Sequence, residues 1–337
     1  MTGPLDVLSV ATVVPPRRTH KSRLGAPSSG LYHHLYEPAG NFSRPDGIPR
    51  GVLTKWSAPY EAPAAEEGQR CSDLALEAAT AAAGDRAGTV ASTFHVQCTL
   101  DQQIVGSAAL RLQHDLFRTA AETMGVGQTG TAGVPTALRL AAATPLARGR
   151  AIAVVAADKW IAPHYRRKAE TPHGDAAGCC LLGRDAERPV ARLLGVHTLV
   201  APPLAGFWHA GAAAVEDHLA AIGATCVDAL LARAGAPAAP RVIVGDAPAS
   251  ALAERVAAAA GLPASPPRPG DDVHLGSAAL VHAVCRGVEQ AVETGAPVEL
   301  VAWTACPSGN AGAVLLRCDP GAVATLNGWT SFPTMNG

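Results

Sequence analysis

Residues 126–160 read VGQTGTAGVPTALRLAAATPLARGRAIAVVAADKW, and residues 174–183 read GDAAGCCLLG. In the first stretch, a turn rich in Gly and Thr opens an apolar helix at Thr131, and this helix leads into a continuous apolar strand at residues 151–157. In the second stretch, a glycine-flanked turn at residues 174–178 starts another apolar run. An uninterrupted apolar strand is typical of a sheet that is buried on both faces. The two stretches therefore predict a layered α/β fold with Thr131 at the N-terminus of a buried helix.

The same order of elements occurs twice along the chain. Residues 275–278 (LGSA) form a second small-residue turn before an Ala-rich helix, and residues 298–303 (VELVAW) form a second apolar strand. The turn at residues 309–312 (GNAG) again leads into an apolar run. This repeat predicts two related halves, 1–187 and 188–337, each with a sheet covered by helices.

The remaining segments fit the same plan. The period and the length of each apolar run distinguish strands from helices. We expect strands at residues 5–14, 89–94, 190–200 and 241–244, and helices at residues 71–83, 107–116, 212–234 and 248–260. Residues 15–70, rich in Pro, Gly, His and Arg, are expected to form a cap loop over a site. Residues 262–273 are expected to form a Pro-rich connector that leads to His274.

The composition indicates a globular protein and excludes several kinds of partner. Of the 337 residues, 48% are hydrophobic and 16% are charged, and the formal net charge is −1. This balance gives no overall field that would attract nucleic acid or an anionic membrane. No apolar run reaches the roughly 18 residues of a membrane span. The apolar start of the chain has no basic residues before it, and we interpret it as a strand and not as a signal peptide.

Eight cysteines are scattered along the chain without a C-x-x-C pair. That spacing argues against a zinc site, and we expect no metal. Most of the cysteines lie in runs of Ala, Val and Leu, where cysteine behaves as a small buried hydrophobic residue. We therefore expect a reducing, cytoplasmic compartment.

These motifs resemble those of the β-ketoacyl-acyl carrier protein synthase III family, within the thiolase superfamily. Thr131-Ala132-Gly133 stands where the family has a Cys-Ala-Gly sequence, and Gly174-Asp175-Ala176-Ala177-Gly178 is similar to its Gly-Asp-Gly-Ala-Gly turn. The resemblance implies the thiolase fold, a five-layered αβαβα arrangement of two pseudo-twofold-related halves. It also implies a dimer, either of two copies or with a homologue. The acyl group would come from acyl-coenzyme A or from the phosphopantetheine arm of an acyl carrier protein, without a tightly bound cofactor.

The positions that carry chemistry in the family differ here. Thr131 replaces the nucleophilic cysteine. Gly245-Asp246-Ala247-Pro248 replaces the motif of the family's catalytic histidine, and His274-Leu275-Gly276 replaces the motif of its catalytic asparagine. A His-Leu-Gly motif at this place is similar to related acyltransferases that acylate an alcohol or an amine. The resemblance therefore implies an acyltransferase of specialised metabolism and not an enzyme that forms carbon–carbon bonds.

Three residues are candidates for the chemistry itself. A neutral His274 can act as general base toward an alcohol or an amine at pH 7. Thr131 is either a nucleophile or only an N-cap, because an alkyl hydroxyl is a much weaker acid than a thiol. Asp246 is expected to cap the helix that follows Pro248, and orientation of His274 or binding of an amine are its alternative roles.

Further residues are candidates for binding substrate. His95 and Cys98 lie in a polar loop after a strand, and Gly309 belongs to a turn whose N–H groups would stabilise an oxyanion. Arg166 and Arg167 lie in a basic run that would contact the phosphates of coenzyme A or phosphopantetheine, or would form a solvated loop face.

Two other functions stay open at this stage. Loss of the family's cysteine, histidine and asparagine would also suit a catalytically silent subunit that pairs with an active homologue, although the presence of His274 argues against it. A condensing or hydrolytic enzyme that uses Thr131 is the further alternative.

Overall fold

A computed structural model describes residues 5–16, 18–20, 61–66, 68–99, 107–118, 121–127, 129–160, 167–168, 171–184, 186–205, 212–246, 250–266, 268 and 271–321. Most of the cap loop predicted at residues 15–70 lies outside these residues, as does Arg166. The side chain of Arg167 also lies outside the described part.

Within the described residues, nine strands form one mixed sheet. The strands of the first part are β1 (Leu5–Val13), β4 (Val90–Val96), β5 (Glu122–Val126), β6 (Ala151–Asp158) and β9 (Ala176–Gly183). Those of the second part are β10 (Ala191–Val200), β11 (Arg241–Val244), β12 (Val298–Ala305) and β13 (Asn310–Cys318). Two short pairs, β2 (Arg18–His20) with β3 (Glu61–Pro63) and β7 (Arg167–Lys168) with β8 (Thr171–Pro172), are separate from this sheet.

The strand order repeats in the two parts of the sheet. From β1 outward it is β1-β9-β6-β4-β5, and from β10 outward it is β10-β13-β12-β11. In each part the second strand is antiparallel to both of its neighbours, and the third and fourth strands are parallel. The two apolar strands recognised in the sequence, β6 and β12, therefore hold equivalent places. The boundary between halves at residue 187 stays a prediction.

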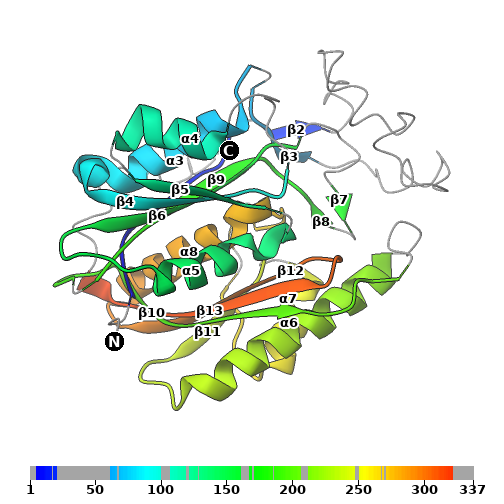
Figure 1. The fold of residues 1–337 in the computed structure, drawn as a ribbon. Coiled ribbons are helices and arrows are strands. Elements are labelled where there is room, and N and C mark those ends of the chain that lie inside the picture. The colour runs from blue at the N-terminus through cyan, green and yellow to red at the C-terminus, as the bar shows by residue number, and fades with distance from the viewer. Residues whose placement is uncertain are drawn as a thin grey trace.

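The helices complete the layers. The described α-helices are α3 (Cys71–Ala83), α4 (Ala108–Leu112), α5 (Gly133–Ala143), α6 (Ala212–Ala234), α7 (Ala251–Ala259) and α8 (Ala279–Thr294), with short 3₁₀ turns η2 (Gly84–Thr89), η4 (Gly130–Ala132) and η6 (Gly276–Ala278). Figure 1 shows α3 and α4 on one outer face, α6 and α7 on the opposite face, and α5 and α8 between the two parts of the sheet. The layers therefore run helix, first part of the sheet, helix, second part of the sheet, helix, and the αβαβα arrangement predicted from the sequence is confirmed.

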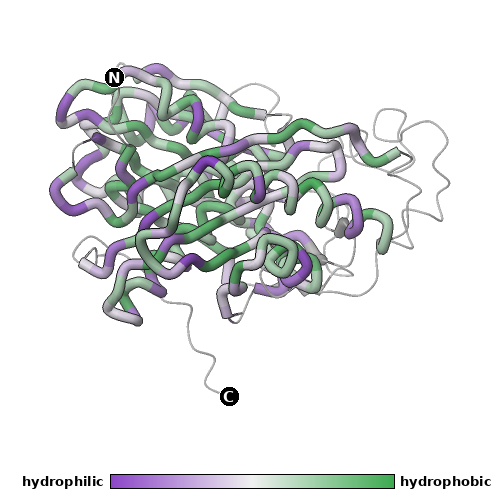
Figure 2. The backbone as a smooth tube through the Cα atoms, turned by 90° about the horizontal axis from the view of Figure 1, so that it is seen from below, coloured by the Kyte–Doolittle hydropathy of each residue, from purple (hydrophilic) through white to green (hydrophobic). Residues whose placement is uncertain are grey.

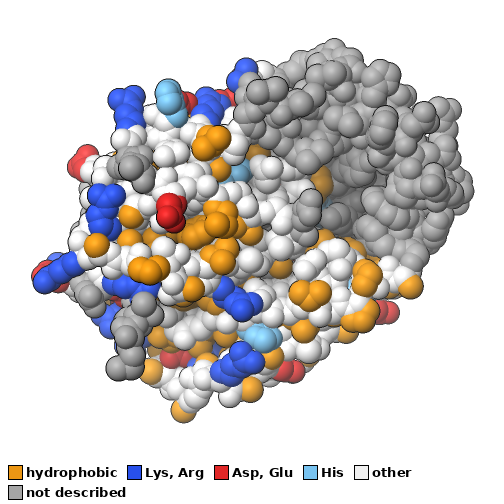
Figure 3. All heavy atoms as spheres, in the orientation of Figure 1, with side chains coloured by type: hydrophobic (Ala, Val, Ile, Leu, Met, Phe, Trp, Pro, Cys, Tyr) orange, Lys and Arg blue, Asp and Glu red, His pale blue; other side chains and the backbone are white. Residues whose placement is uncertain are grey.

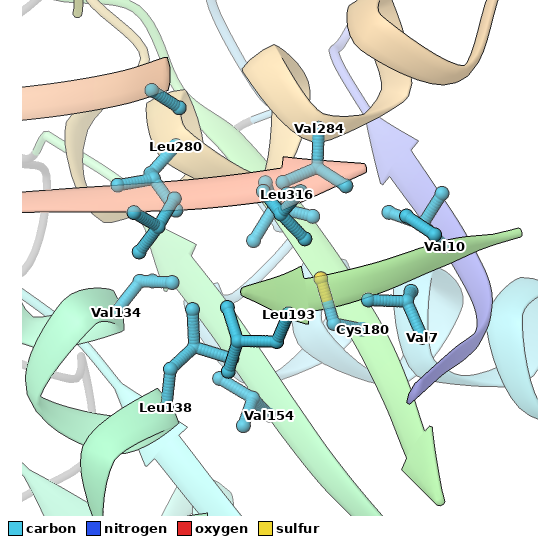
Figure 4. Close-up of a cluster of buried hydrophobic side chains, with 14 of the residues drawn as sticks. Val7, Val10, Val134, Leu138, Val154, Cys180, Leu193, Leu280, Val284 and Leu316 are labelled. Atoms are coloured by element: carbon cyan, nitrogen blue, oxygen red, sulfur yellow. The ribbon is translucent and has the colours of Figure 1, made fainter. Parts of the chain in front are cut away.

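A hydrophobic core fills the middle layer. Apolar side chains of α5, α8 and strands from both parts of the sheet converge on one cluster (Figure 4). The labelled members are Val7, Val10, Val134, Leu138, Val154, Cys180, Leu193, Leu280, Val284 and Leu316. Burial of one such aliphatic side chain is worth about 1.5–3 kcal/mol. The cluster therefore fixes both inner helices, and with them the turns at which these helices begin.

Two predicted elements differ from the structure. The helix expected at residues 107–116 is a short α-helix followed by a π-helical turn, η3 (Gln113–Phe117), which ends at Arg118 with φ at +49°. The strand expected to end at Phe94 continues to Val96. His95 consequently lies in the sheet and not in a loop.

The surface agrees with the composition. Hydrophobic residues gather along the strands of the interior, and hydrophilic residues lie mainly in loops and at outer positions (Figure 2). On the face seen in Figure 3, basic and acidic side chains are scattered without one dominant sign. In the described part of the chain, no helix combines the length and the apolar character needed to cross a membrane.

Candidate active site

The turns η4 and η6 begin the two inner helices and pack on each other. Each starts with a glycine at positive φ, +55° for Gly130 and +59° for Gly276. A Cβ atom on Gly130 would lie 2.5 Å from Sγ of Cys306, and one on Gly276 would lie 2.4 Å from Oδ2 of Asp158. Both positions therefore require glycine, because the backbone is left-handed and the neighbours are close.

A cavity opens beside these turns, at the ends of β11 and β12. Its volume is about 40 Å³. Thr131 and His274, which the sequence predicts to share a site, both line it. The other lining residues are His173, Glu216, Leu219, Asp246, Ser250, Leu252, Ala253, Trp303, Ala305, Cys306 and Pro307. No cluster of His, Cys, Asp and Glu that could hold a metal ion occurs among the residues the structure describes.

His274 is held at both nitrogens of its ring. Nδ1 accepts a hydrogen bond of 2.9 Å from the backbone N–H of Gly276, and Nε2 lies 3.2 Å from Oδ2 of Asp246. Because Nδ1 accepts, the proton of the neutral ring is on Nε2 and is donated to the carboxylate. The ring also stacks on His173, with centroids 4.4 Å apart and planes inclined by 7°. These contacts fix both the tautomer and the orientation of His274.

The two carboxylate oxygens of Asp246 have different surroundings. Besides His274, Oδ2 accepts hydrogen bonds from Oγ1 of Thr304 at 2.8 Å and from the N–H of Ala305 at 3.1 Å. Oδ1 is buried and has no hydrogen-bond partner within the described structure. The residue as a whole is 8% exposed. Asp246 therefore orients His274 through Oδ2, while Oδ1 is a buried oxygen without a hydrogen-bond partner in the described structure.

The capping role predicted for Asp246 is wrong. Helix α7 begins three residues later than expected from Pro248, and its N-cap is Ser250, whose side chain accepts from the N–H of Ala253. The side chain of Asp246 instead contacts the end of β12.

Thr131 is also tied to the end of β12. Its hydroxyl donates a hydrogen bond of 3.2 Å to the carbonyl oxygen of Ala305, and the residue is 5% exposed. It lies within η4, whose N-cap is Thr129, and α5 has Ala132 at its N-cap. The N-cap interpretation of Thr131 is therefore wrong, because its hydroxyl reaches across to another strand and not to its own helix.

Two buried aspartates brace the backbone around the cavity. Oδ1 of Asp158 accepts from the N–H groups of Cys98 at 2.8 Å and Thr99 at 2.7 Å, and its Oδ2 accepts from the N–H of Ser277 at 2.6 Å. Asp175 likewise accepts backbone N–H bonds, from Ala65 and Trp160.

His95 and Cys98 are not among the described residues that line this cavity, and their binding role stays a prediction. His95 is 2% exposed within β4, and burial lowers its pKa to about 4. Sγ of Cys98 lies 3.0 Å from Oγ of Ser277.

The oxyanion role predicted for Gly309 is also wrong. Its φ is +89°, and its N–H donates a hydrogen bond of 2.9 Å to the carbonyl oxygen of Cys306. Its own carbonyl oxygen accepts from the N–H of Ala201 at 2.8 Å. The glycine therefore closes the turn between β12 and β13 and does not face the cavity.

The lining residues that sequence reasoning missed include His173, Glu216, Trp303 and Cys306. His173 directly precedes the glycine turn and Trp303 lies near the end of an apolar strand, so both carried a positional signal. Glu216 lies on a long helix with many polar positions, and only the packing of α6 against the second part of the sheet brings it here.

Comparisons of the structure with solved structures give strong matches. One is ChlB3, described as an acyltransferase, with a TM-score of 0.67 at 20% identity, covering 95% of this chain and 99% of that one. A second is 3-oxoacyl-(acyl carrier protein) synthase III, FabH, from Pseudomonas aeruginosa, with a TM-score of 0.65 at 16% identity over 94% and 99% of the two chains. A third is AbyA1, a tetronic acid condensing enzyme, with a TM-score of 0.66 at 14% identity over 93% and 99%. No protein-family model and no curated protein sequence matches the chain. The chain therefore has the thiolase fold of synthase III-like enzymes, as the sequence predicts.

Proposed function

We propose that this chain is an acyltransferase that moves an acyl group from a thioester of coenzyme A or of an acyl carrier protein to a hydroxyl or an amine. The observation that carries the proposal is the Asp246–His274 pair, which lines the same cavity as Thr131 at the start of an inner helix. The similarity in fold to ChlB3 and to FabH supports a thioester as the acyl donor.

In the proposed reaction, the Asp246–His274 pair accepts the proton of the attacking group. Nδ1 of His274 already accepts from Gly276, so the open electron pair of this unit is on Oδ1 of Asp246. An acceptor O–H or N–H that donates to the Asp246–His274 pair presents its oxygen or nitrogen to the thioester carbonyl carbon. We therefore propose that the Asp246–His274 pair, and not His274 alone, acts as the general base.

The transfer balances without any further reagent. As the new carbon–oxygen or carbon–nitrogen bond forms, the acceptor's proton passes to the Asp246–His274 pair. The carbon–sulfur bond then breaks, and the proton goes to the departing sulfur, which leaves as a thiol. His274 stabilises the carboxylate throughout by donating through Nε2.

The start of the helix supplies the proposed stabilisation of negative charge. Helix α5 begins at Gly133, two residues after Thr131, which lines the cavity, so the positive end of the helix dipole lies next to the site. A tetrahedral intermediate with its oxygen at this end gains the electrostatic stabilisation typical of an oxyanion hole.

Two features support direct transfer over the alternatives that use a covalent intermediate or a condensation. The hydroxyl of Thr131 is engaged by the carbonyl of Ala305, so attack by it would first break that bond. A carboxylate at Asp246 would repel the enolate formed in a decarboxylative condensation. AbyA1, described as a condensing enzyme, and ChlB3, described as an acyltransferase, share the fold, so the fold by itself does not separate these chemistries.

The test is incubation of the purified chain with acetyl-, butyryl- and octanoyl-coenzyme A in the presence of alcohol and amine acceptors. Products are measured by liquid chromatography and mass spectrometry, and the protein by intact mass. We expect an acylated acceptor without a stable acyl-protein adduct. A stable adduct on Thr131 contradicts direct transfer, and the absence of any acylated product with all donors and acceptors contradicts the proposed activity of the isolated chain.

A further inference from the structure

A second imidazole covers one face of the His274 ring. His173, which directly precedes the glycine turn of residues 174–178, stacks on it with ring centroids 4.4 Å apart and planes inclined by 7°. Both residues are buried and both line the cavity. His173 precedes β9 in the first part of the chain and His274 precedes α8 in the second. The stack therefore joins the two parts of the chain at the site itself.

The backbone sets the spacing of the two rings. His173 and His274 form a parallel β-bridge, and the N–H of Gly174 donates a hydrogen bond of 2.9 Å to the carbonyl oxygen of His274. A Cβ atom on Gly174 would lie 2.9 Å from Cδ of Pro63 and 3.0 Å from Cγ1 of Val273, so this bridge is closely packed. The stacked rings consequently start from backbone positions that are fixed relative to each other.

The ring of His173 has a support of its own. It meets the ring of Trp160 edge to face, with centroids 4.8 Å apart and planes inclined by 82°, which is an arrangement that aromatic pairs prefer. The backbone N–H of Trp160 donates a hydrogen bond of 2.8 Å to Oδ1 of the buried Asp175. His173 can therefore serve as a fixed flat surface for His274.

The hydrogen bonds of His274 do not by themselves define the tilt of its ring. Both act at ring nitrogens, in the plane of the imidazole. The contact of Nε2 with Oδ2 of Asp246 is 3.2 Å, longer than the roughly 2.7–2.9 Å of a strong charge-assisted bond. Contacts in the plane resist sliding of the ring better than rotation out of the plane. A parallel ring against one face resists that rotation, because tilting would drive the imidazole into it.

We infer that His173 is a positioning residue, whose ring holds the imidazole of His274 in the plane in which Nε2 meets Asp246. The inference deepens the proposed function and rests on it, because the Asp246–His274 pair is the proposed general base. A misplacement of about 1 Å in such a group can lower the rate by about 10²-fold. The role requires a flat ring at residue 173 and neither of its nitrogen atoms, so phenylalanine should be able to replace histidine there.

The first arm of the experiment compares His173→Phe with His173→Ala in the full chain, with a thioester and an acceptor that the unmodified chain uses. We expect His173→Ala to lower kcat by about 10-fold or more with KM within about 2-fold, and His173→Phe to retain at least about a third of kcat. Equal losses of kcat in the two variants overturn the inference, because they would mean that a nitrogen atom is needed. A rise in KM without a loss of kcat overturns it as well.

Two further variants serve as controls for this arm. His197→Ala changes a half-buried histidine of β10 that is not among the described residues lining the cavity, and it should leave kcat as in the unmodified chain. Circular dichroism checks that each variant is folded. His173→Leu, which fills the space without a flat ring, replaces His173→Ala in the comparison if the alanine variant does not fold.

The second arm tests whether His173 acts through His274. In a chain that already carries His274→Ala, the further change His173→Ala should lower the remaining turnover by less than about 2-fold, because the ring that it positions is gone. Losses that multiply in the double variant overturn the inference and leave the proposed acyl transfer intact.

The third arm observes the ring of His274 by nuclear magnetic resonance and needs no turnover. With nitrogen-labelled histidine, a neutral ring held as one tautomer gives one protonated and one unprotonated nitrogen resonance, and His274→Gln identifies the pair. We expect both resonances to persist in His173→Phe and to move toward a common average in His173→Ala, because a tilting ring exchanges its tautomers. Unchanged resonances in His173→Ala overturn the inference. The expected spectra in a chain that turns over no thioester support the positioning role and contradict the proposed function.

Discussion

Nε2 of His274 lies 3.2 Å from Oδ2 of Asp246, and this contact joins the Pro-rich connector to the end of β11. The same oxygen accepts from the N–H of Ala305, whose carbonyl accepts from the hydroxyl of Thr131. One continuous path of hydrogen bonds therefore links the starts of the two inner helices through the end of β12. A substitution at any one of these residues should therefore change the positions of the others.

His274→Ala should lower turnover by about 10²–10⁴-fold with an accepted substrate, the usual range for loss of acid–base function. It removes the donor to Asp246 and leaves the carboxylate without its orienting partner. Steady-state kinetics measures the effect, and circular dichroism checks that the variant is folded. Near-unmodified turnover in a folded variant contradicts the role assigned to the pair.

Thr131→Ala should lower turnover by less than about 10-fold, because direct transfer does not use its hydroxyl as a nucleophile. The double variant with His274→Ala should resemble His274→Ala alone. If Thr131 carries the acyl group, the two single changes are instead similarly severe. Kinetics of both single variants and the double variant distinguishes these outcomes.

Gly276→Ala should destabilise the fold and lower activity together. The left-handed backbone alone costs a residue with a Cβ atom about 1–2 kcal/mol, and the added atom would also lie 2.4 Å from Asp158. Gly261→Ala is the matched control, because its φ is +62° with no atom within 4 Å of the added Cβ. Urea unfolding should show the greater loss for Gly276→Ala, and equal losses would contradict the close approach.

The loss of folding stability at acid pH should depend on His95. Burial lowers its pKa to about 4, below the value of about 6.5 in an unfolded chain. The unfolded state therefore binds more protons between these values, and stability falls as the pH drops from about 6.5 to about 4, by up to about 1.4 kcal/mol per pH unit. In His95→Gln this part of the pH dependence of urea unfolding should be lost. An unchanged slope would show that other groups dominate it.

Arg286→Met should destabilise the segment that leads to His274. Arg286 and Asp271 form a buried ion pair, and burial of Asp271 is outweighed by hydrogen bonds from His282 and Arg286, so that the pKa of Asp271 is lowered. Removing one partner of a buried pair costs about 3–5 kcal/mol. Arg255→Met, which breaks an exposed pair with Asp217, should cost about 0–1 kcal/mol.

The pH dependence of the stability that the Arg286–Asp271 pair contributes provides a second measurement. A lowered pKa of Asp271 in the folded state contributes stability above the unfolded value of about 3.9, and this contribution is lost as the pH falls through the folded pKa. Thermal unfolding of the unmodified chain and Arg286→Met should therefore converge at strongly acid pH. Curves that stay equally far apart from neutral to acid pH contradict the linkage.

Much of the fold could be read from the sequence because its elements are buried on both faces. Strands β6 and β12 are continuous apolar runs, and the glycines of the turns before α5 and α8 are required by left-handed backbone and close neighbours. The shared cavity of Thr131 and His274 was implied by the resemblance to the synthase III family, and both residues line it.

The contacts that define the site could be read only in part. Asp246 looks like a helix cap because it precedes Pro248, and only the approach of β12 supplies the partners that its carboxylate has in the fold. His95 looked like a loop residue because the expected strand ended at Phe94, whereas β4 continues to Val96. Such errors arise where side-chain partners come from distant segments and leave no local pattern.

The place of β1 in the sheet has a consequence for how the protein is made. β1 lies between β9 and β10, and Leu5 pairs with Leu193 in the register that joins the two parts of the sheet. A ribosome must therefore release β1 long before its partners exist. Contacts so distant in the chain are slow to form, and an unpaired apolar strand in a nascent chain is prone to aggregate. The first part cannot complete its sheet until β9 has emerged, and the junction closes only with β10, so β1 stays without its sheet partners while the segments between them are synthesised.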